Sequence, residues 1–136
     1  MFSDSKIAII GSGSWATALA KILISKNHSI NWYFRNPENI RFFEANHHNP
    51  SYLCDVLFDM SKITFYNDLD KIAEESDILI LVTPSAFLKE SLSKLTVDIS
   101  KKFIVSAIKG IVPDDNLIVG KFINQQFNVP LDSIGI

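Results

Sequence analysis

Hydrophobic residues group into short continuous runs that are separated by longer amphipathic segments. The runs are expected to form strands at residues 6–10, 30–34, 63–66, 77–82 and 103–107. Their apolar positions are mostly consecutive rather than alternating, which is typical of strands buried on both faces of a parallel sheet. A last run at residues 131–136 is expected to begin one further strand.

The segments between these runs have the spacing of helices. In the first, apolar residues at i, i+3, i+4, i+7 and i+8 predict a core-facing stripe of Trp15, Ala18, Leu19, Ile22 and Leu23. Further helices are expected at residues 37–44, 68–75, 85–93 and 114–127, and residues 46–60 are expected to be irregular. Because strands and helices alternate throughout, the sequence predicts an α/β fold, a Rossmann-type doubly wound parallel sheet with helices on both faces.

A glycine-rich turn joins the first predicted strand to the first predicted helix. It matches G-x-G-x-x-A with Gly11, Ser12, Gly13, Ser14, Trp15 and Ala16. In this context Gly11 permits a tight turn, Gly13 lets a pyrophosphate approach the backbone, and Ala16 keeps the helix close to the sheet. The free amides near Ser14 and Trp15 would face the phosphates. The alternatives are a turn that binds nothing and, for Trp15, packing in the core.

The end of the second strand bears on the choice of dinucleotide. Domains that prefer NADH place an acid about twenty residues beyond the glycines, to bind the ribose hydroxyls. Here the strand ends in Tyr33, Phe34, Arg35 and Asn36, without an acid. Arg35 can pair with a 2′-phosphate or stack on adenine, which favours NADPH over NADH. The alternative is a solvated surface arginine.

Composition narrows the function classes. The chain has 136 residues, a net charge of −2 and one cysteine, Cys54. These values predict one domain without a basic surface for nucleic acid, without an internal disulfide and without a cysteine-rich zinc site. No apolar run approaches the ~20 residues of a membrane span, and residues 1–6 lack a signal-peptide pattern, so a cytoplasmic location is expected.

Other chemistry-bearing residues give weaker signals. His47 and His48 are adjacent but lack a third ligand at metal spacing, so no metal site is expected. Cys54 has no obvious partner base, and Ser85 lacks the G-x-S-x-G setting of a hydrolase nucleophile. Lys109 follows a central strand, where ligands of doubly wound sheets bind, and can attract a phosphate or polarise a carbonyl. Its alternative role is merely to end that strand.

Four segments together resemble the N-terminal domain of NAD(P)-dependent glycerol-3-phosphate dehydrogenases. Residues 11–20 (GSGSWATALA) resemble the family's GxGxWGTALA turn, with Ala16 in place of the commoner glycine. Residues 82–87 (VTPSAF) resemble its VPS or VPHQF turn, and residues 106–111 (SAIKGI) its KG segment. Residues 49–53 (NPSYL) stand where the family has KYLP, but they lack its lysine and proline, which leaves the role of Tyr52 open.

The resemblance implies a two-domain enzyme that interconverts dihydroxyacetone phosphate and sn-glycerol 3-phosphate with NADPH or NADH and feeds glycerophospholipid synthesis. It implies cofactor contacts for the turn residues 11–16, Arg35, Pro84 and Phe87, and contacts of Lys109 with both cofactor and substrate. The family's helical C-terminal domain supplies the catalytic acid/base lysine. Residues 1–136 are therefore expected to be the NAD(P)-binding domain of a longer protein, inactive alone, with a homodimer as a candidate assembly at full length.

Two other functions share these features. One is another ketoacid or hydroxyacid reductase, such as a ketopantoate reductase-like protein, and the Lys109–Gly110 segment disfavours it. The other is a nucleotide-binding module without chemistry, which a natural stop at residue 136 would favour.

Overall fold

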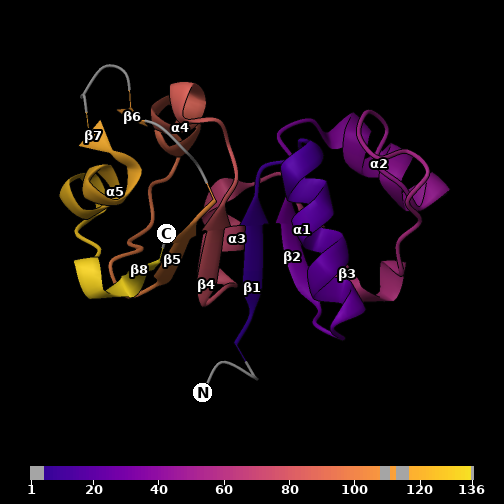
Figure 1. Cartoon of the computed structure of the whole chain (residues 1–136), viewed down its shortest axis with the longest axis horizontal. Coiled ribbons are helices and arrows are strands. Elements are labelled where there is room, and N and C mark those ends of the chain that lie inside the picture. The colour runs from indigo at the N-terminus through magenta and orange to yellow at the C-terminus, as the bar shows by residue number, and fades with distance from the viewer. Residues whose placement is uncertain (1–4, 108–110, 113–116, 136) are drawn as a thin grey trace.

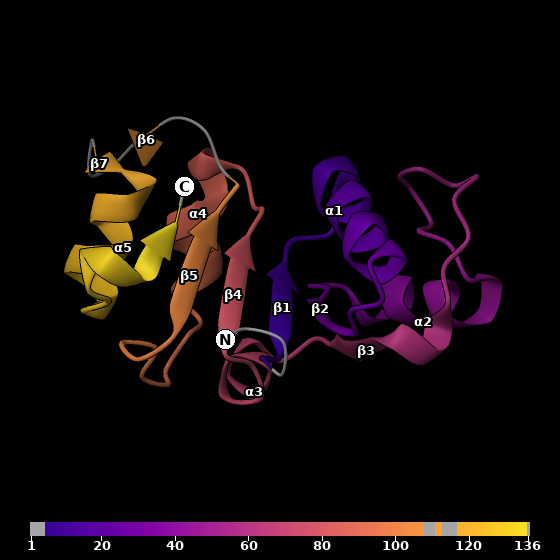
Figure 2. The same cartoon turned by 60° about the horizontal axis from the view of Figure 1, so that its bottom comes forward.

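The computed structural model of the chain describes residues 5–107, 111–112 and 117–135. Its main sheet has six strands in the order β3-β2-β1-β4-β5-β8 (Figures 1 and 2). They are β1 (Ile7–Ile10), β2 (Ile30–Tyr33), β3 (Ile63–Tyr66), β4 (Ile78–Leu81), β5 (Phe103–Ser106) and β8 (Ile134–Gly135). Every neighbouring pair is parallel, which confirms the predicted doubly wound sheet.

Helices cover both faces of this sheet. They are α1 (Ser14–Ser25), α2 (Pro37–Asn46), α3 (Leu69–Glu74), α4 (Ser85–Leu92) and α5 (Val119–Phe127). Within β1, Ile9 packs in a hydrophobic cluster with α1 and α2, whereas Ala8 and Ile10 pack in a second cluster with α3, α4 and α5. Successive side chains of a strand point to opposite faces, so the two clusters lie on opposite sides of the sheet. Figure 1 shows α1 in front of the sheet and α3 behind it.

An aromatic cluster on the α1 side connects the core to the turn after β1. At its centre Trp32 is fully buried, with ring centroids 5.0–6.0 Å from those of Phe34, Phe43, Phe58 and Phe65. The indole Nε1 of Trp32 donates a hydrogen bond of 2.7 Å to the carbonyl of Gly11. The largest core side chain therefore also anchors the glycine-rich turn.

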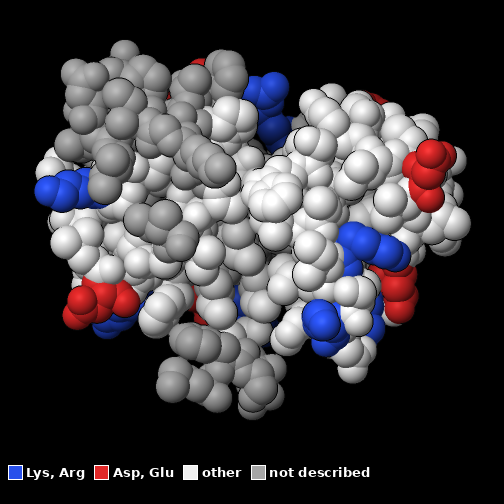
Figure 3. Space-filling view, viewed as in Figure 1, with Lys and Arg blue, Asp and Glu red and all other residues white. Residues whose placement is uncertain are grey.

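The buried face of α1 differs from the predicted one. The residues that pack on the sheet are Ala16, Thr17 and Ala20, whereas Trp15 and Ile22 of the predicted stripe are 56% and 52% exposed. The prediction of a core-facing Trp15 is therefore wrong. A small residue at position 16 lets the helix lie close to the sheet. Trp15 and Ile22 then face outward, whereas Leu23 of the predicted stripe is partly buried against the core. In Figure 3 the surface over the upper part of α1 is largely free of charged side chains.

The C-terminal part of the chain also differs from the prediction. Instead of a helix over 114–127, α5 begins at Val119 and follows β7 (Leu117–Ile118), which pairs antiparallel with β6 (Ile111–Val112). Residues 113–116, which the prediction placed partly in the helix, lie outside the described ranges. The predicted last strand is shorter, because a 3-10 helix (Leu131–Ser133) precedes β8. The sequence between the two short strands is Pro-Asp-Asp-Asn, whose residue types favour turns over helix interiors.

The predicted irregular segment after α2 returns to pack on α1. It contains turns and a short 3-10 helix (Met60–Lys62), which confirms the absence of a long regular element there. Lys21 of α1 donates a hydrogen bond to the carbonyl of Leu57 at 2.6 Å, and its ammonium lies 5.3 Å from the ring centroid of Phe58. This segment reaches the glycine-rich turn at Asn49.

Candidate functional site

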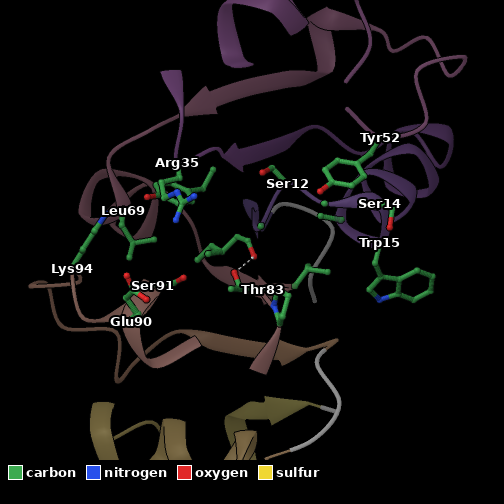
Figure 4. Close-up of a pocket in the computed structure, with 17 residues that line it drawn as sticks. Ser12, Ser14, Trp15, Arg35, Tyr52, Leu69, Thr83, Glu90, Ser91 and Lys94 are labelled. Atoms are coloured by element: carbon green, nitrogen blue, oxygen red, sulfur yellow. Dashed lines mark hydrogen bonds between the residues drawn. The ribbon is translucent and has the colours of Figure 1, made fainter. Parts of the chain in front are cut away.

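A cavity of about 570 Å³ opens at the carboxyl ends of β1, β2 and β4 (Figure 4). Its walls come from the turn between β1 and α1, from the end of β2, from residues 82–84 after β4, and from α4. From β1 the chain continues to β2 on one side, whereas from β4 it continues to β5 on the other. Doubly wound sheets bind ligands at such a switch point. The cavity therefore lies where this fold is expected to hold a ligand.

The two glycines of the turn have different reasons to be glycine. Gly11 has a φ of +135°, and a Cβ there would lie 3.0 Å from the carbonyl carbon of Val82. A side chain at Gly11 would therefore strain the backbone and collide with the end of β4. A Cβ on Gly13 would meet nothing within 4 Å. Gly13 thus leaves open the space through which a ligand can approach the backbone.

Backbone amides without intrahelical acceptors face this space at the start of α1. The first intrahelical bond runs from the amide of Thr17 to the carbonyl of Gly13 at 3.0 Å. The amides of Ser14, Trp15 and Ala16 precede that bond, and no side chain caps the helix at Gly13. No acidic residue lies in the first turn of α1. The helix start is therefore suited to an anion.

The carbonyls of the same turn are each held by a side chain. The indole Nε1 of Trp32 donates to the carbonyl of Gly11 at 2.7 Å. The amide Nδ2 of Asn49 donates to the carbonyl of Ser12 at 3.2 Å, and the hydroxyl of Thr17 donates to that of Gly13 at 2.7 Å. Sequence reasoning missed all three donors. With its carbonyls held by these donors, the turn offers its free backbone amides to an anion.

The far end of the cavity carries positive charge. Figure 4 shows Arg35 and Lys94 at the end away from Trp15. Both are exposed, and both line the cavity. Sequence reasoning found Arg35 but missed Lys94, because only the fold brings the residues after α4 beside the end of β2.

Tyr33, the last residue of β2, lines the cavity and remains protonated. Burial raises the pKa of its phenol above the usual value; the positive charge of Arg35 partly offsets this, and the negative charge of Asp68 adds to it. At neutral pH Tyr33 therefore offers a hydroxyl donor and acceptor rather than a negative charge that would repel a phosphate.

The end of β4 forms the third wall. The amide of Val82 donates to the carbonyl of Ile10 at 2.9 Å, and the hydroxyl of Thr83 lies 3.5 Å from the same carbonyl (Figure 4). These contacts place Val82, Thr83 and Pro84 along the cavity, directly beside the turn. Pro84, which the sequence predicted as a site residue, then precedes the first residue of α4.

Two aromatic side chains stand at the mouth of the cavity. Trp15 and Tyr52 both line it, and they are 56% and 46% exposed (Figure 4). For Trp15 this leaves the cofactor-contact prediction open and removes the core-packing alternative. For Tyr52, whose role the sequence left open, the fold supplies a position in the lining of the cavity.

Other residues singled out in the sequence lie outside the cavity or outside the described part of the chain. The Phe87 side chain and all of Lys109 lie outside the described part of the chain, so their predicted roles remain predictions. Cys54 is an exposed free cysteine. Among the described residues, no group of three or more histidine, cysteine, aspartate or glutamate side chains is placed to hold a metal ion. None of the described helices is long and apolar enough to cross a membrane.

Comparison with known proteins identifies the family. The family described as NAD-dependent glycerol-3-phosphate dehydrogenase N-terminus matches residues 6–136. The chain belongs to this family. It corresponds to the family's N-terminal, NAD-binding domain, which confirms the predicted resemblance and decides against the ketopantoate reductase-like alternative.

Individual relatives agree with this assignment. A glycerol-3-phosphate dehydrogenase (NAD(P)+) from Oceanobacillus iheyensis is 30% identical over 131 residues, which cover 95% of this chain and 37% of that protein. One from Chlorobium phaeobacteroides is 36% identical over 110 residues, covering 80% and 33%. The solved glycerol-3-phosphate dehydrogenase of Plasmodium falciparum superposes with a TM-score of 0.77 at 26% identity, covering 93% and 39%. The chain thus spans about a third to two fifths of the length of these relatives.

Proposed function

We propose that the cavity binds NAD(P)H, with the pyrophosphate on the amides at the start of α1. The observation that carries this proposal is the open space at Gly13, which lies next to amides without intrahelical acceptors. The turn's carbonyls are bound to Trp32, Asn49 and Thr17, so they do not compete for those amides or repel the phosphates. The site fits a linked pair of phosphates because it offers several donors and no acidic side chain in the first helical turn.

We further propose that the chain is the cofactor-binding domain of an enzyme that interconverts dihydroxyacetone phosphate and sn-glycerol 3-phosphate. The relatives are glycerol-3-phosphate dehydrogenases, which supports this substrate pair. The bound cofactor supplies the hydride for the ketone carbon, and this chain binds and orients it. Lys109 would contact cofactor and substrate, and Phe87 would pack beside the cofactor, as the family resemblance implies.

The remaining chemistry is assigned to residues beyond this chain. We propose that residues 1–136 form the NAD(P)-binding domain and that a helical C-terminal domain, present in the remaining length of the relatives, supplies the acid/base lysine and most substrate contacts. On this proposal the chain alone binds cofactor without turnover. A homodimer at full length, a cytoplasmic location and a role in supplying glycerophospholipid synthesis belong to the same proposal.

For the nucleotide we propose a preference for NADPH. Arg35 and Lys94 place two cationic side chains at one end of the cavity, at the end of β2 where the ribose of a dinucleotide binds in this fold. A 2′-phosphate there would gain charge-assisted hydrogen bonds that a ribose hydroxyl cannot match. Glu90 also lines this end, so its carboxylate offsets one of the two positive charges and the three side chains together remain net positive.

Titration calorimetry of the 136-residue chain with NADPH and NADH tests this proposal. Both should bind with a Kd of roughly tens of micromolar, about 6–7 kcal/mol, with NADPH the tighter. Replacing Arg35 by Ala should weaken NADPH roughly tenfold and NADH less than about twofold, since a charged hydrogen bond contributes about 1.5–3 kcal/mol. Arg41→Ala is the matched control, because Arg41 pairs with Glu38 on α2 and does not line the cavity.

Two results would count against the proposal separately. An absence of heat with both cofactors at millimolar concentration would contradict cofactor binding itself. Equal losses for NADPH and NADH in Arg35→Ala would leave cofactor binding intact and contradict the contact with the 2′-phosphate.

A further inference from the structure

Asn49 is a buried polar side chain beside the cavity whose hydrogen-bonding groups are all used. It is 1% exposed and lies in the irregular segment after α2, where the family resemblance of residues 49–53 assigned it no role. Its Nδ2 donates to the carbonyl of Ser12 at 3.2 Å and to the hydroxyl of Thr17 at 3.0 Å. Its Oδ1 accepts from the amides of Ser51 and Tyr52 at 2.9 and 3.1 Å. Both amide hydrogens and both lone pairs of the oxygen are therefore bonded.

The four partners determine which residue type can stand at this position. The two backbone amides require an oxygen, and the backbone carbonyl of Ser12 requires a donor, so the side chain must present both on one planar group. An aspartate would set a buried negative oxygen against that carbonyl. Only an asparagine or a close analogue satisfies all four partners at this size.

These bonds join two walls of the cavity that are far apart in sequence. The contacts of Asn49 with Ser12 and Thr17 span 37 and 32 residues. On one side Asn49 binds the middle carbonyl of the glycine-rich turn and the hydroxyl that in turn binds the carbonyl of Gly13. On the other it fixes the backbone of Tyr52, whose ring stands at the cavity mouth (Figure 4).

We propose that Asn49 is a positioning residue for pyrophosphate binding: it holds the glycine-rich turn with its amides directed to the cavity and seats Tyr52 over the same site. This inference rests on the proposed function, because it concerns the same cavity. Asn49 itself is buried and acts on the ligand through the turn and through Tyr52. Its loss frees the carbonyl of Ser12 to rotate, and a carbonyl oxygen that faces the phosphates would repel them.

The test compares ligands that use different parts of the cavity. ADP-ribose carries the pyrophosphate, whereas adenosine 2′-monophosphate carries only the phosphate expected at Arg35. In the 136-residue chain, Asn49→Ala should weaken ADP-ribose roughly tenfold and leave adenosine 2′-monophosphate within about twofold. Asn31→Ala is the matched control, because Asn31 also donates its Nδ2 to a side-chain hydroxyl, that of Ser76 at 2.9 Å, but does not line the cavity. The Asn31→Ala variant should bind both ligands with the affinity of the unchanged chain.

Equal losses for both ligands, or no loss for ADP-ribose, would overturn the positioning role, since general destabilisation does not distinguish the ligands. If Asn49→Ala does not fold, Asn49→Ser keeps a buried hydroxyl that can bind only some of the partners, and it should show the same selective loss to a smaller extent. Failure of the unchanged chain to bind ADP-ribose would contradict the proposed function instead, and so would be distinguished from failure of this inference.

Discussion

At the residue scale, the two glycines of the turn have different roles, one in folding and the other in ligand binding. Gly11 is required by its own backbone, because its φ is +135° and a Cβ at this position would lie 3.0 Å from the carbonyl carbon of Val82. Gly13 has an ordinary φ of −79° and open space around it. The fold therefore has room for a side chain at Gly13. A ligand bound in that space would collide with such a side chain.

Alanine at Gly11 should mainly lower stability, whereas alanine at Gly13 should mainly weaken cofactor binding. Gly11→Ala should lower the free energy of unfolding by roughly 1–3 kcal/mol through backbone strain. Gly13→Ala should cost about 1 kcal/mol or less as a poorer helix cap, yet weaken NADPH roughly tenfold. Urea unfolding and calorimetry on both variants check this. A stable Gly11→Ala variant, or undiminished NADPH binding by Gly13→Ala, would contradict the roles assigned to them.

The sequence predicts only some residues of this site, for a physical reason. The glycines, Ser14 and Arg35 were found because their roles follow from a local motif and its distance from the next strand. Thr17, Asn49 and Lys94 were missed because their roles depend on contacts between segments that the fold brings together. A buried asparagine in an irregular segment carries no signal until its four partners are known.

At the scale of elements, helix faces were harder to predict than helix positions. The stripe through Trp15 and Ile22 has the spacing of a core face, but the sheet accepts the smaller residues Ala16 and Ala20. The spacing of apolar residues predicts which side chains share a helix face. It does not predict which of two apolar faces packs against the sheet. Asp68 caps α3 by accepting hydrogen bonds from the backbone amides of Asp70 and Lys71.

Asp70 links α3 to the loop after α4 and should make this contact sensitive to acid. Hydrogen bonds from the hydroxyl and amide of Thr96, and from the amide of Val97, lower the pKa of Asp70 below its usual value. A carboxyl with a lowered folded pKa stabilises the fold above its unfolded pKa, and this contribution is lost as the pH falls through the folded value. Stability should therefore decline below about pH 4.

Thermal unfolding between pH 7 and pH 3 checks this link. Asp70→Asn should unfold at a lower temperature than the unchanged chain at pH 7, and the gap should narrow as the pH falls through the range in which Asp70 becomes protonated. Asp132→Asn, at an exposed position in the 3-10 helix before β8, is the control. A gap that stays constant with pH would show that the charge of Asp70 does not contribute.

At the scale of the whole molecule, the alternation of buried strands and helices was enough to predict the fold class. The strand order changes direction between β1 and β4, and with right-handed crossovers this change puts helices on both faces of the sheet. The sequence pattern did not predict the short antiparallel β6–β7 pair. A net charge of −2 gives no general attraction for an anionic cofactor, so binding depends on the local donors at α1 and the cations near β2.

Binding of the pyrophosphate by backbone amides at the start of α1 is the central claim. The most direct measurement is an NMR titration of the ¹⁵N-labelled chain with NADPH that follows individual amide resonances. The largest shifts should fall on Ser14, Trp15 and Ala16, while Ser76, which precedes the opposite end of β4, should not move. Saturable binding that leaves the amides of Ser14 to Ala16 unshifted would contradict the account.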